Sequence, residues 1–164
     1  MNDGTPSAYA GTIAGRRQPY SYRHDPTVPQ FPDDRPIIVF DGICALCSGW
    51  VRFVLRHDRK GLYRFIPAQS ALGRALYVHY GLDPEDYETN ILIQDGRAWF
   101  KAGGTIRMLQ NLGFPWSLAG ALRIVPAAWL DPLYERLARN RFRIGGRLDA
   151  CYRPDPGHEG RFLA

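Results

Sequence analysis

The sequence has 164 residues, of which 45% are hydrophobic and 13% aromatic, a composition typical of one globular domain with a short extra segment. Its 21 basic and 16 acidic side chains give a net charge of +5 without a recognised nucleic-acid motif, so no nucleic-acid partner is expected. Because no signal-peptide pattern or apolar run of about 20 residues is present, we expect a cytoplasmic protein with no transmembrane segment.

Residues 1–36 differ in composition from the rest of the chain. They are rich in Pro, Gly, Tyr and Arg and lack a sustained apolar period. We predict a disordered or loosely packed tail here. The alternative is that its tyrosines pack over the domain that follows.

An ordered core is predicted to begin after Pro36. The run Ile37-Ile38-Val39-Phe40 is short, apolar and rich in β-branched residues, as in a strand buried on both faces. Asp41-Gly42 ends the strand. A helix is expected to begin near Cys44 and to end before Gly61, which suits a left-handed C-terminal cap.

Further elements are predicted up to residue 113. Residues 62–66 and 90–94 have the pattern of strands, and the residues around 72–80 have the pattern of a helix. Asp95-Gly96 predicts a two-residue hairpin turn into a strand at 97–100. Thr105 is expected to cap a last helix. The order β-α-β-α-β-β-α over residues 37–113 predicts a thioredoxin-like α/β fold with three layers.

Residues 114–164 are predicted to be a helical extension with an irregular C-terminus, packed on the same domain. Three prolines should divide it into short helical pieces: Pro115, Pro126 and Pro132. We expect Trp116, Trp129 and Leu130 to lie in the core or at a partner surface, with weak interfacial membrane contact as the alternative.

Arginines recur between residues 136 and 147 of this extension: Arg136, Arg139, Arg141, Arg143 and Arg147. They are interpreted as a solvated helix face or as partners of intramolecular acids such as Asp149. Cys151 is expected to be a buried, inert thiol, with a third redox thiol or a metal ligand as alternatives. None of the four histidines stands at ligand spacing from the Cys44–Cys47 pair, and a structural zinc site needs four ligands, so no metal site is predicted.

The chemistry is concentrated in Cys44-Ala45-Leu46-Cys47. Residues three apart on a helix share a face, and two cysteines there can reach the Cα separation of about 5.5 Å that a disulfide needs. Cys44 would lie at the helix N-terminus, where free amides and the helix dipole stabilise a thiolate. Cys44 is therefore the predicted attacking thiol, and Cys47 the thiol that resolves a mixed disulfide.

The motif Asp41-Gly42-x-Cys44-x-x-Cys47, together with the segments SGWVRFVLRHDRKG and LYRFIPAQS, resembles the DCC family. The resemblance continues through LIQDG, GFPWSL and YERLARNRFRIGGRLDACYRP, and so covers about residues 37–163. Members of this family are named for the Asp-Cys-Cys pattern. The resemblance implies a thioredoxin-like core and thiol–disulfide oxidoreductase activity.

Two positions near the dithiol carry further hypotheses. Asp41 is a candidate catalytic residue that takes the proton of Cys47; the alternative is that it only caps the turn or the helix start. Thr89 stands near the position where thioredoxins have a cis-proline. We expect a trans peptide bond before Thr89 and binding of a soft metal by the reduced protein.

The predicted function is thiol–disulfide exchange with a protein or low-molecular-weight disulfide. A cellular thiol reductant is implied as electron donor, and no cofactor is expected. Two other functions stay open. One is a soft-metal carrier, because two thiolates suit Cu(I). The other is a non-catalytic thioredoxin-like binding module.

Overall fold

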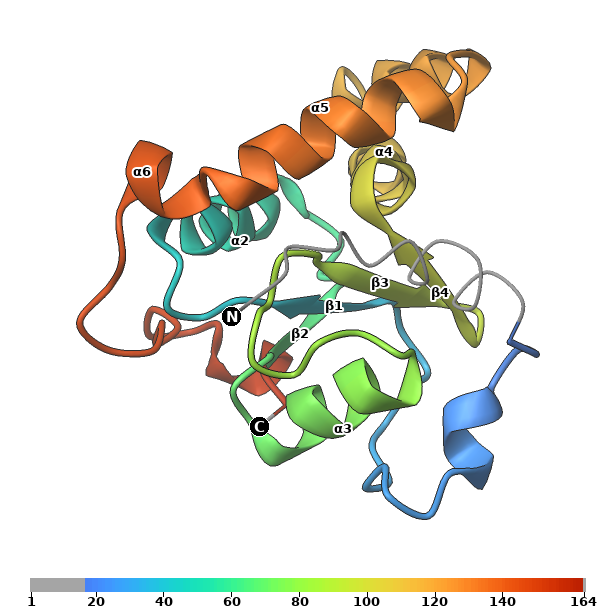
Figure 1. The fold of residues 1–164 in the computed structure, drawn as a ribbon, viewed down its shortest axis with the longest axis vertical. Helices are drawn as coiled ribbons and strands as arrows, with labels where there is room; N and C mark the ends of the chain where they lie inside the picture. Colours follow the sequence, from blue (N-terminus) through green and yellow to red (C-terminus); the bar gives the residue numbers. More distant parts are fainter. Residues whose placement is uncertain (1–16, 164) are drawn as a thin grey trace, which may run out of the picture.

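The computed structural model of the chain describes residues 17–163 (Figure 1). Strand β1 pairs with β2 in parallel and with β3 in antiparallel fashion, and β3 and β4 form a hairpin, so the sheet order is β2-β1-β3-β4. The strands are β1 (Ile37–Phe40), β2 (Arg64–Pro67), β3 (Ile91–Gln94) and β4 (Arg97–Phe100). The Asp95-Gly96 turn has positive φ at both residues, as a two-residue hairpin of this kind requires.

Helices cover both faces of this mixed sheet. Ile37 and Val39 pack in one apolar cluster with residues of α3 (Ala71–His79). Ile38 and Phe40 pack in a second cluster with residues of α2 (Ala45–His57) and α4 (Lys101–Asn111). Figure 1 shows α3 on one side of the sheet and α2 and α4 on the other. The predicted thioredoxin-like plan with three layers is confirmed.

One helix start differs from the prediction. The last core helix, α4, begins at Lys101, directly after β4, and Thr105 is therefore inside it. The Thr105 hydroxyl does not cap the helix and instead donates to the Lys101 carbonyl at 3.2 Å. A threonine inside a helix can donate to the carbonyl four residues earlier. The sequence alone does not distinguish such a threonine from one that caps the helix.

The extension forms η2 (Trp116–Ile124), α5 (Ala127–Arg139), α6 (Arg141–Gly145) and η3 (Glu159–Arg161). Helix α5 lies across α4, on the side away from the sheet (Figure 1). Pro132 does not divide the extension as predicted but lies inside α5. Proline removes one backbone hydrogen bond, and the exposed Ala128 carbonyl that loses its donor can bond water instead. No helix among the described residues is long and apolar enough to cross a membrane.

The second half of the expected tail is packed on the domain. Residues 17–36 include the short helix η1 (Ser21–His24), and both Tyr22 and Val28 are buried in the cluster that contains α3. The structure here differs from a loose segment and agrees with the alternative of packed tyrosines. Residues 1–16 lie outside the described residues.

A polar contact also holds this N-terminal segment to α3. The buried His79 ring places Nδ1 2.6 Å from Asp25 Oδ2 and Nε2 2.9 Å from Ser21 Oγ. Hydrogen bonds from the Thr27 side chain and from His79 hold the pKa of Asp25 well below its usual range. The contribution of Asp25 to stability is therefore present at neutral pH and is lost only as pH falls through its depressed pKa.

His79→Ala is expected to reduce the free energy of unfolding by about 1–3 kcal/mol, because it removes a buried ring and both of its hydrogen bonds. Hydrogen exchange should quicken within residues 17–36 and stay unchanged in β1. His24→Ala, at an exposed position of the same segment, is the control. Equal exchange in the two variants would contradict the role of His79.

Candidate active site

The site begins where β1 ends, at a turn that holds the Asp41 carboxylate inside the protein. Asp41 Oδ1 accepts the Ile43 N–H at 3.1 Å and the Gln69 Nε2 amide at 2.6 Å. Gln69 in turn accepts the Gly42 N–H on its Oε1 at 3.0 Å. The predicted turn-capping role of Asp41 is therefore present in the structure. Gln69, which follows β2, is a residue that sequence reasoning missed.

Cys44 is the N-cap residue of α2, at the position that the sequence predicts. Its backbone is extended, and its Sγ accepts the N–H of Cys47 at 3.3 Å. A sulfur in this position receives a backbone hydrogen bond and faces the positive end of the helix dipole. Both effects stabilise negative charge on sulfur.

Cys47 lies one turn into α2 and is half-buried. Burial raises the pKa of the Cys47 thiol well above its usual range, and the hydrogen bond and negative charge of Cys44, as well as the charge of Asp41, act in the same direction. Cys47 is therefore a protonated thiol at neutral pH. The two cysteines of the motif have different environments, as a pair with an attacking and a resolving member requires.

Among residues 17–163, the second oxygen of Asp41 has no hydrogen-bond partner. Asp41 Oδ2 is buried and lies 3.6 Å from Arg141 Nε, which is also buried and forms no hydrogen bond with a described residue. A buried carboxylate with a free oxygen retains the capacity to accept a proton. The charge of this carboxylate acts on Cys47. Asp41, Cys44 and Cys47 are thus brought together in one site.

Arg141 is a residue of this site that sequence reasoning did not single out, because it is one of several arginines between residues 136 and 147. It lies in α6, where its guanidinium donates to Asp86 Oδ1 at 2.9 Å and to the Ala138 carbonyl at 3.0 Å. Burial disfavours its charge, but Asp86, Asp41 and Cys47 raise the pKa of Arg141 overall. Of the predicted alternatives for the arginine run, intramolecular pairing holds here, with Asp86 and Asp41 as partners.

A C-terminal strap, residues 146–152, runs along the motif. The Ala45 N–H donates to the Gly146 carbonyl at 3.2 Å, and the Leu148 N–H donates to the Ile43 carbonyl at 2.8 Å. Cys44 also forms an antiparallel bridge with Arg147. Under this strap the exposed fraction of Cys44 is 0%. A disulfide in solution can therefore meet the Cys44 sulfur only after a local movement.

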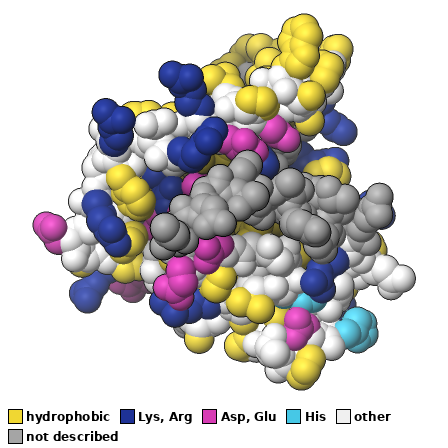
Figure 2. All heavy atoms as spheres, viewed as in Figure 1, with side chains coloured by type: hydrophobic (Ala, Val, Ile, Leu, Met, Phe, Trp, Pro, Cys, Tyr) yellow, Lys and Arg dark blue, Asp and Glu magenta, His cyan; other side chains and the backbone are white. Residues whose placement is uncertain are grey.

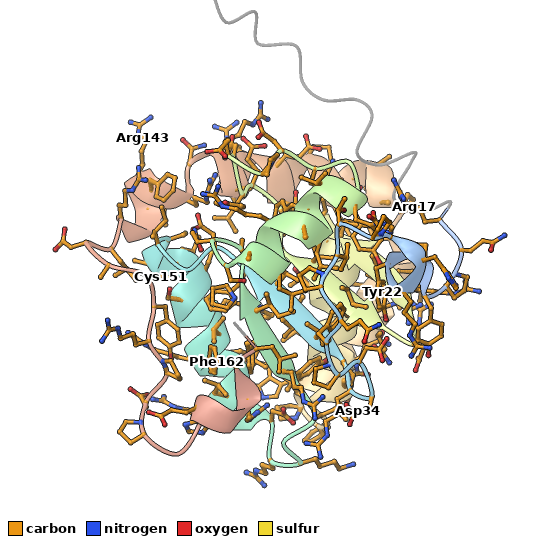
Figure 3. All side chains as sticks on the ribbon, turned by 90° about the horizontal axis from the view of Figure 1, so that it is seen from below. Arg17, Tyr22, Asp34, Arg143, Cys151 and Phe162 are labelled. Carbon is orange, nitrogen blue, oxygen red and sulfur yellow. The ribbon has the colours of Figure 1, made fainter. Side chains whose placement is uncertain are left out.

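Cys151 lies in the same strap and is not the buried thiol that we expected. The residue is exposed, and its Sγ lies so close to Gly42 that a Cβ there would be 2.5 Å away. Figure 3 shows Cys151 on the C-terminal segment beside the core. Partial burial of its sulfur, together with the charge of Asp41, raises the pKa of the Cys151 thiol. Within the described part of the chain, no group of three or more His, Cys, Asp or Glu could hold a metal ion.

Thr89 precedes β3 at the end of the sheet where β1 ends, because Val39 pairs with Ile91 in antiparallel register. The peptide bond before Thr89 is trans, as expected, since the cis bond among the described residues precedes Pro115. The Thr89 carbonyl accepts the Tyr77 hydroxyl at 2.5 Å. This hydrogen bond fixes the loop to α3.

A second tyrosine binds the same loop from the extension. The Asn90 N–H donates to the Tyr134 hydroxyl at 3.3 Å. Burial raises the pKa of Tyr134 to about 12, and a thiolate at Cys47 would act in the same direction. Tyr134 is therefore a neutral hydroxyl that lies within electrostatic reach of the dithiol.

The sequence profile of the family described as DCC1-like thiol-disulfide oxidoreductase matches residues 38–147. A DCC family protein of Arabidopsis thaliana, designated chloroplastic, is 38% identical over 120 residues, which cover 73% of this chain and 70% of the relative. The uncharacterized protein YuxK of Bacillus subtilis is 33% identical over 127 residues, 77% of this chain and 93% of the relative. No solved structure matches the chain significantly.

Gly146 offers a test of the strap, because it has φ +83° and ψ 175° and its Cβ position is open. Alanine there costs about 1–3 kcal/mol of backbone strain, so local opening of the strap should increase about tenfold. Alkylation of Cys44 by iodoacetamide, followed by peptide mass spectrometry, should quicken to the same extent. Gly157→Ala carries a similar strain outside the strap and should leave the rate unchanged. Equal rates in the two variants would contradict the covering role.

Proposed function

Because the chain belongs to the DCC1-like thiol-disulfide oxidoreductase family, we propose that it exchanges a Cys44–Cys47 dithiol with a protein or small-molecule disulfide. The observation that carries this proposal is the asymmetry of the pair. Cys44 is the more buried of the two, and its Sγ accepts a helix N-terminal N–H at 3.3 Å. The pKa of the half-buried Cys47 is raised by burial and also by the hydrogen bond and negative charge of Cys44. The helix N-terminal hydrogen bond favours a thiolate at Cys44, and the raised pKa keeps Cys47 protonated until the resolving step.

The exchange proceeds in two displacements. The Cys44 thiolate attacks one sulfur of the substrate disulfide, which forms a mixed disulfide and releases one substrate thiolate. Cys47 then loses its proton and attacks Cys44 Sγ, which releases the second substrate sulfur and leaves a Cys44–Cys47 disulfide. Two electrons pass from the dithiol to the substrate. A cellular thiol reductant, of the thioredoxin or glutathione class, returns the pair to the dithiol.

Asp41 is the proposed acceptor of the Cys47 proton. Its buried Oδ2 has no hydrogen-bond partner in the described part of the chain, and its charge acts on Cys47. Arg141 lies 3.6 Å from that oxygen and balances the negative charge that the site carries before the proton moves. In this role Arg141 is a positioning residue, because it acts on the dithiol through Asp41.

Access to the dithiol requires the strap to move, since Cys44 has no exposed surface. The hydrogen bonds that cover Cys44 are few and lie near the surface, so their opening costs much less than global unfolding. The proposed compartment is a reducing one, the cytoplasm, in keeping with three free cysteines. The chloroplast designation of the Arabidopsis relative belongs to that protein.

Cys47→Ser tests the proposal directly. With the resolving thiol absent, the mixed disulfide on Cys44 should accumulate and be visible as a mass increase after incubation with glutathione disulfide or an oxidised protein. Cys44→Ser should form no adduct in the motif. Cys151→Ser should keep turnover within about twofold, a barrier change of roughly 0.4 kcal/mol.

Three outcomes would contradict the assignment. An adduct on Cys47 in Cys44→Ser would reverse the roles. A hundredfold loss of turnover in Cys151→Ser would make Cys151 part of the cycle. A wild-type protein that forms neither adduct nor internal disulfide would instead be a non-catalytic binding module, and Cu(I) titration of the reduced protein would then test the metal-carrier alternative.

Asp41→Asn separates proton transfer from simple electrostatics. As a proton acceptor, Asp41 should contribute about a hundredfold or more to the resolving step at neutral pH. The variant should therefore accumulate the mixed disulfide and recover as pH rises. If Asp41 acts only by its charge, which raises the pKa of Cys47, its removal should quicken the step. Stopped-flow quenching with mass analysis measures the rate, with Asp155→Asn, at an exposed position away from Arg141, as the control.

A further inference from the structure

The extension presents an apolar surface that nothing in the described structure covers. Of the nine large apolar side chains that are exposed among the described residues, all but Val78 and Ile144 lie between residues 114 and 137. Neither η2 nor α5 contains a buried residue. The seven side chains, here called the η2–α5 apolar face, are Phe114, Leu118, Leu122, Ile124, Trp129, Leu133 and Leu137.

Three side chains of the face lie along one side of α5. Trp129, Leu133 and Leu137 are spaced by four residues and so lie on one side of the helix. Leu130 and Tyr134 lie on the adjoining flank of the helix and are partly buried. Figure 2 shows apolar side chains gathered at the end of the molecule formed by η2 and the start of α5. A contiguous patch of this kind on a domain marks a contact with a partner or a membrane.

Positive charge flanks the apolar face. Residues 114–145 contain five arginines and two acids, Asp131 and Glu135, and Glu135 already pairs with Lys101. Arg123, Arg136 and Arg139 are exposed on the same elements. Arg143 of α6 points away from the molecule in Figure 3. The occupant of this face must therefore accept apolar side chains and carry negative charge.

We propose that the η2–α5 apolar face docks peripherally on a membrane that contains anionic lipids. An exposed tryptophan and aliphatic side chains beside arginines are the combination that binds the boundary between headgroups and acyl chains. Each arginine near such a surface gains attraction from the negative potential of the lipids. A second copy of the chain fits less well, because a two-fold contact would bring the same arginines together without acids to match them.

Vesicle binding by the full chain tests the proposal. The protein should sediment with vesicles of phosphatidylglycerol and phosphatidylcholine, bind pure phosphatidylcholine weakly, and lose affinity as salt rises. Tryptophan emission should shift to shorter wavelength on binding, because Trp129 is 76% exposed in the free protein. Trp129→Phe should still bind but lose that shift.

Substitutions on the face should weaken binding to the mixed vesicles. Trp129→Ser with Leu133→Ser, and Arg136→Glu with Arg139→Glu, should each reduce the affinity by about tenfold or more. Val78→Ser and Arg153→Glu are matched controls at exposed positions elsewhere and should bind as the wild type does. Disulfide exchange in solution should be unchanged in every variant, which separates this test from the proposed function.

Three results would overturn the proposal. One is the absence of binding to the anionic vesicles. Another is binding that the serine pair does not weaken. The third is a dimer in light scattering that the serine pair dissociates, because the face would then be an interface between copies of the chain.

Discussion

Strand β1 must bury four consecutive apolar residues, and the architecture follows from that requirement. Side chains alternate along a strand, so Ile37 to Phe40 reach an apolar environment only if layers cover both faces of the sheet. Each such burial is worth about 1.5–3 kcal/mol. Helix α3 covers one face of β1 and helices α2 and α4 cover the other, while β2 and β3 flank it in the central position of the sheet. This position also fixes the next residue, Asp41, at the inner end of the strand, where its carboxylate is buried.

The buried carboxylate then accounts for much of what surrounds the dithiol. An ionised group inside a protein is costly unless hydrogen bonds and an opposite charge compensate for lost water. Gln69 and the Ile43 amide supply the hydrogen bonds from the core, and Arg141 supplies the charge from the extension. The extension is thus a structural part of the site, in addition to its packing on α4.

Helices, strands and turns that are determined by residues adjacent in the sequence could be predicted from short sequence patterns. The apolar run of β1, the Asp95-Gly96 turn and the start of α2 at Cys44 belong to this class, and the structure contains all of them. The environment of the dithiol depends on contacts about a hundred residues apart, such as Leu148 with Ile43. No periodicity encodes such a contact. One weak signal existed for Arg141, which is one arginine among several in a run with few acids.

Pro132 and Cys151 show a second limit of sequence reasoning. Both predictions rested on the average behaviour of a residue type, and in both the outcome depends on whether water or space is available nearby. The Ala128 carbonyl is exposed, so water can replace the N–H that Pro132 lacks. The absence of a side chain at Gly42 leaves room for a sulfur from the strap. Neither circumstance can be read from a window of neighbouring residues.

The hydrogen bonds that cover Cys44 come from C-terminal residues and therefore form late in biosynthesis. Protein chains are made from the N-terminus, so Cys44 and Cys47 leave the ribosome roughly a hundred residues before Arg147 and Leu148. During that interval the strap hydrogen bonds and the Arg141 charge do not exist. The nascent dithiol therefore spends its first seconds without the shield and the counter-charge of the mature protein, at a synthesis rate of about 5–20 residues per second. The dithiol is therefore most accessible to oxidants while the chain is still being synthesised.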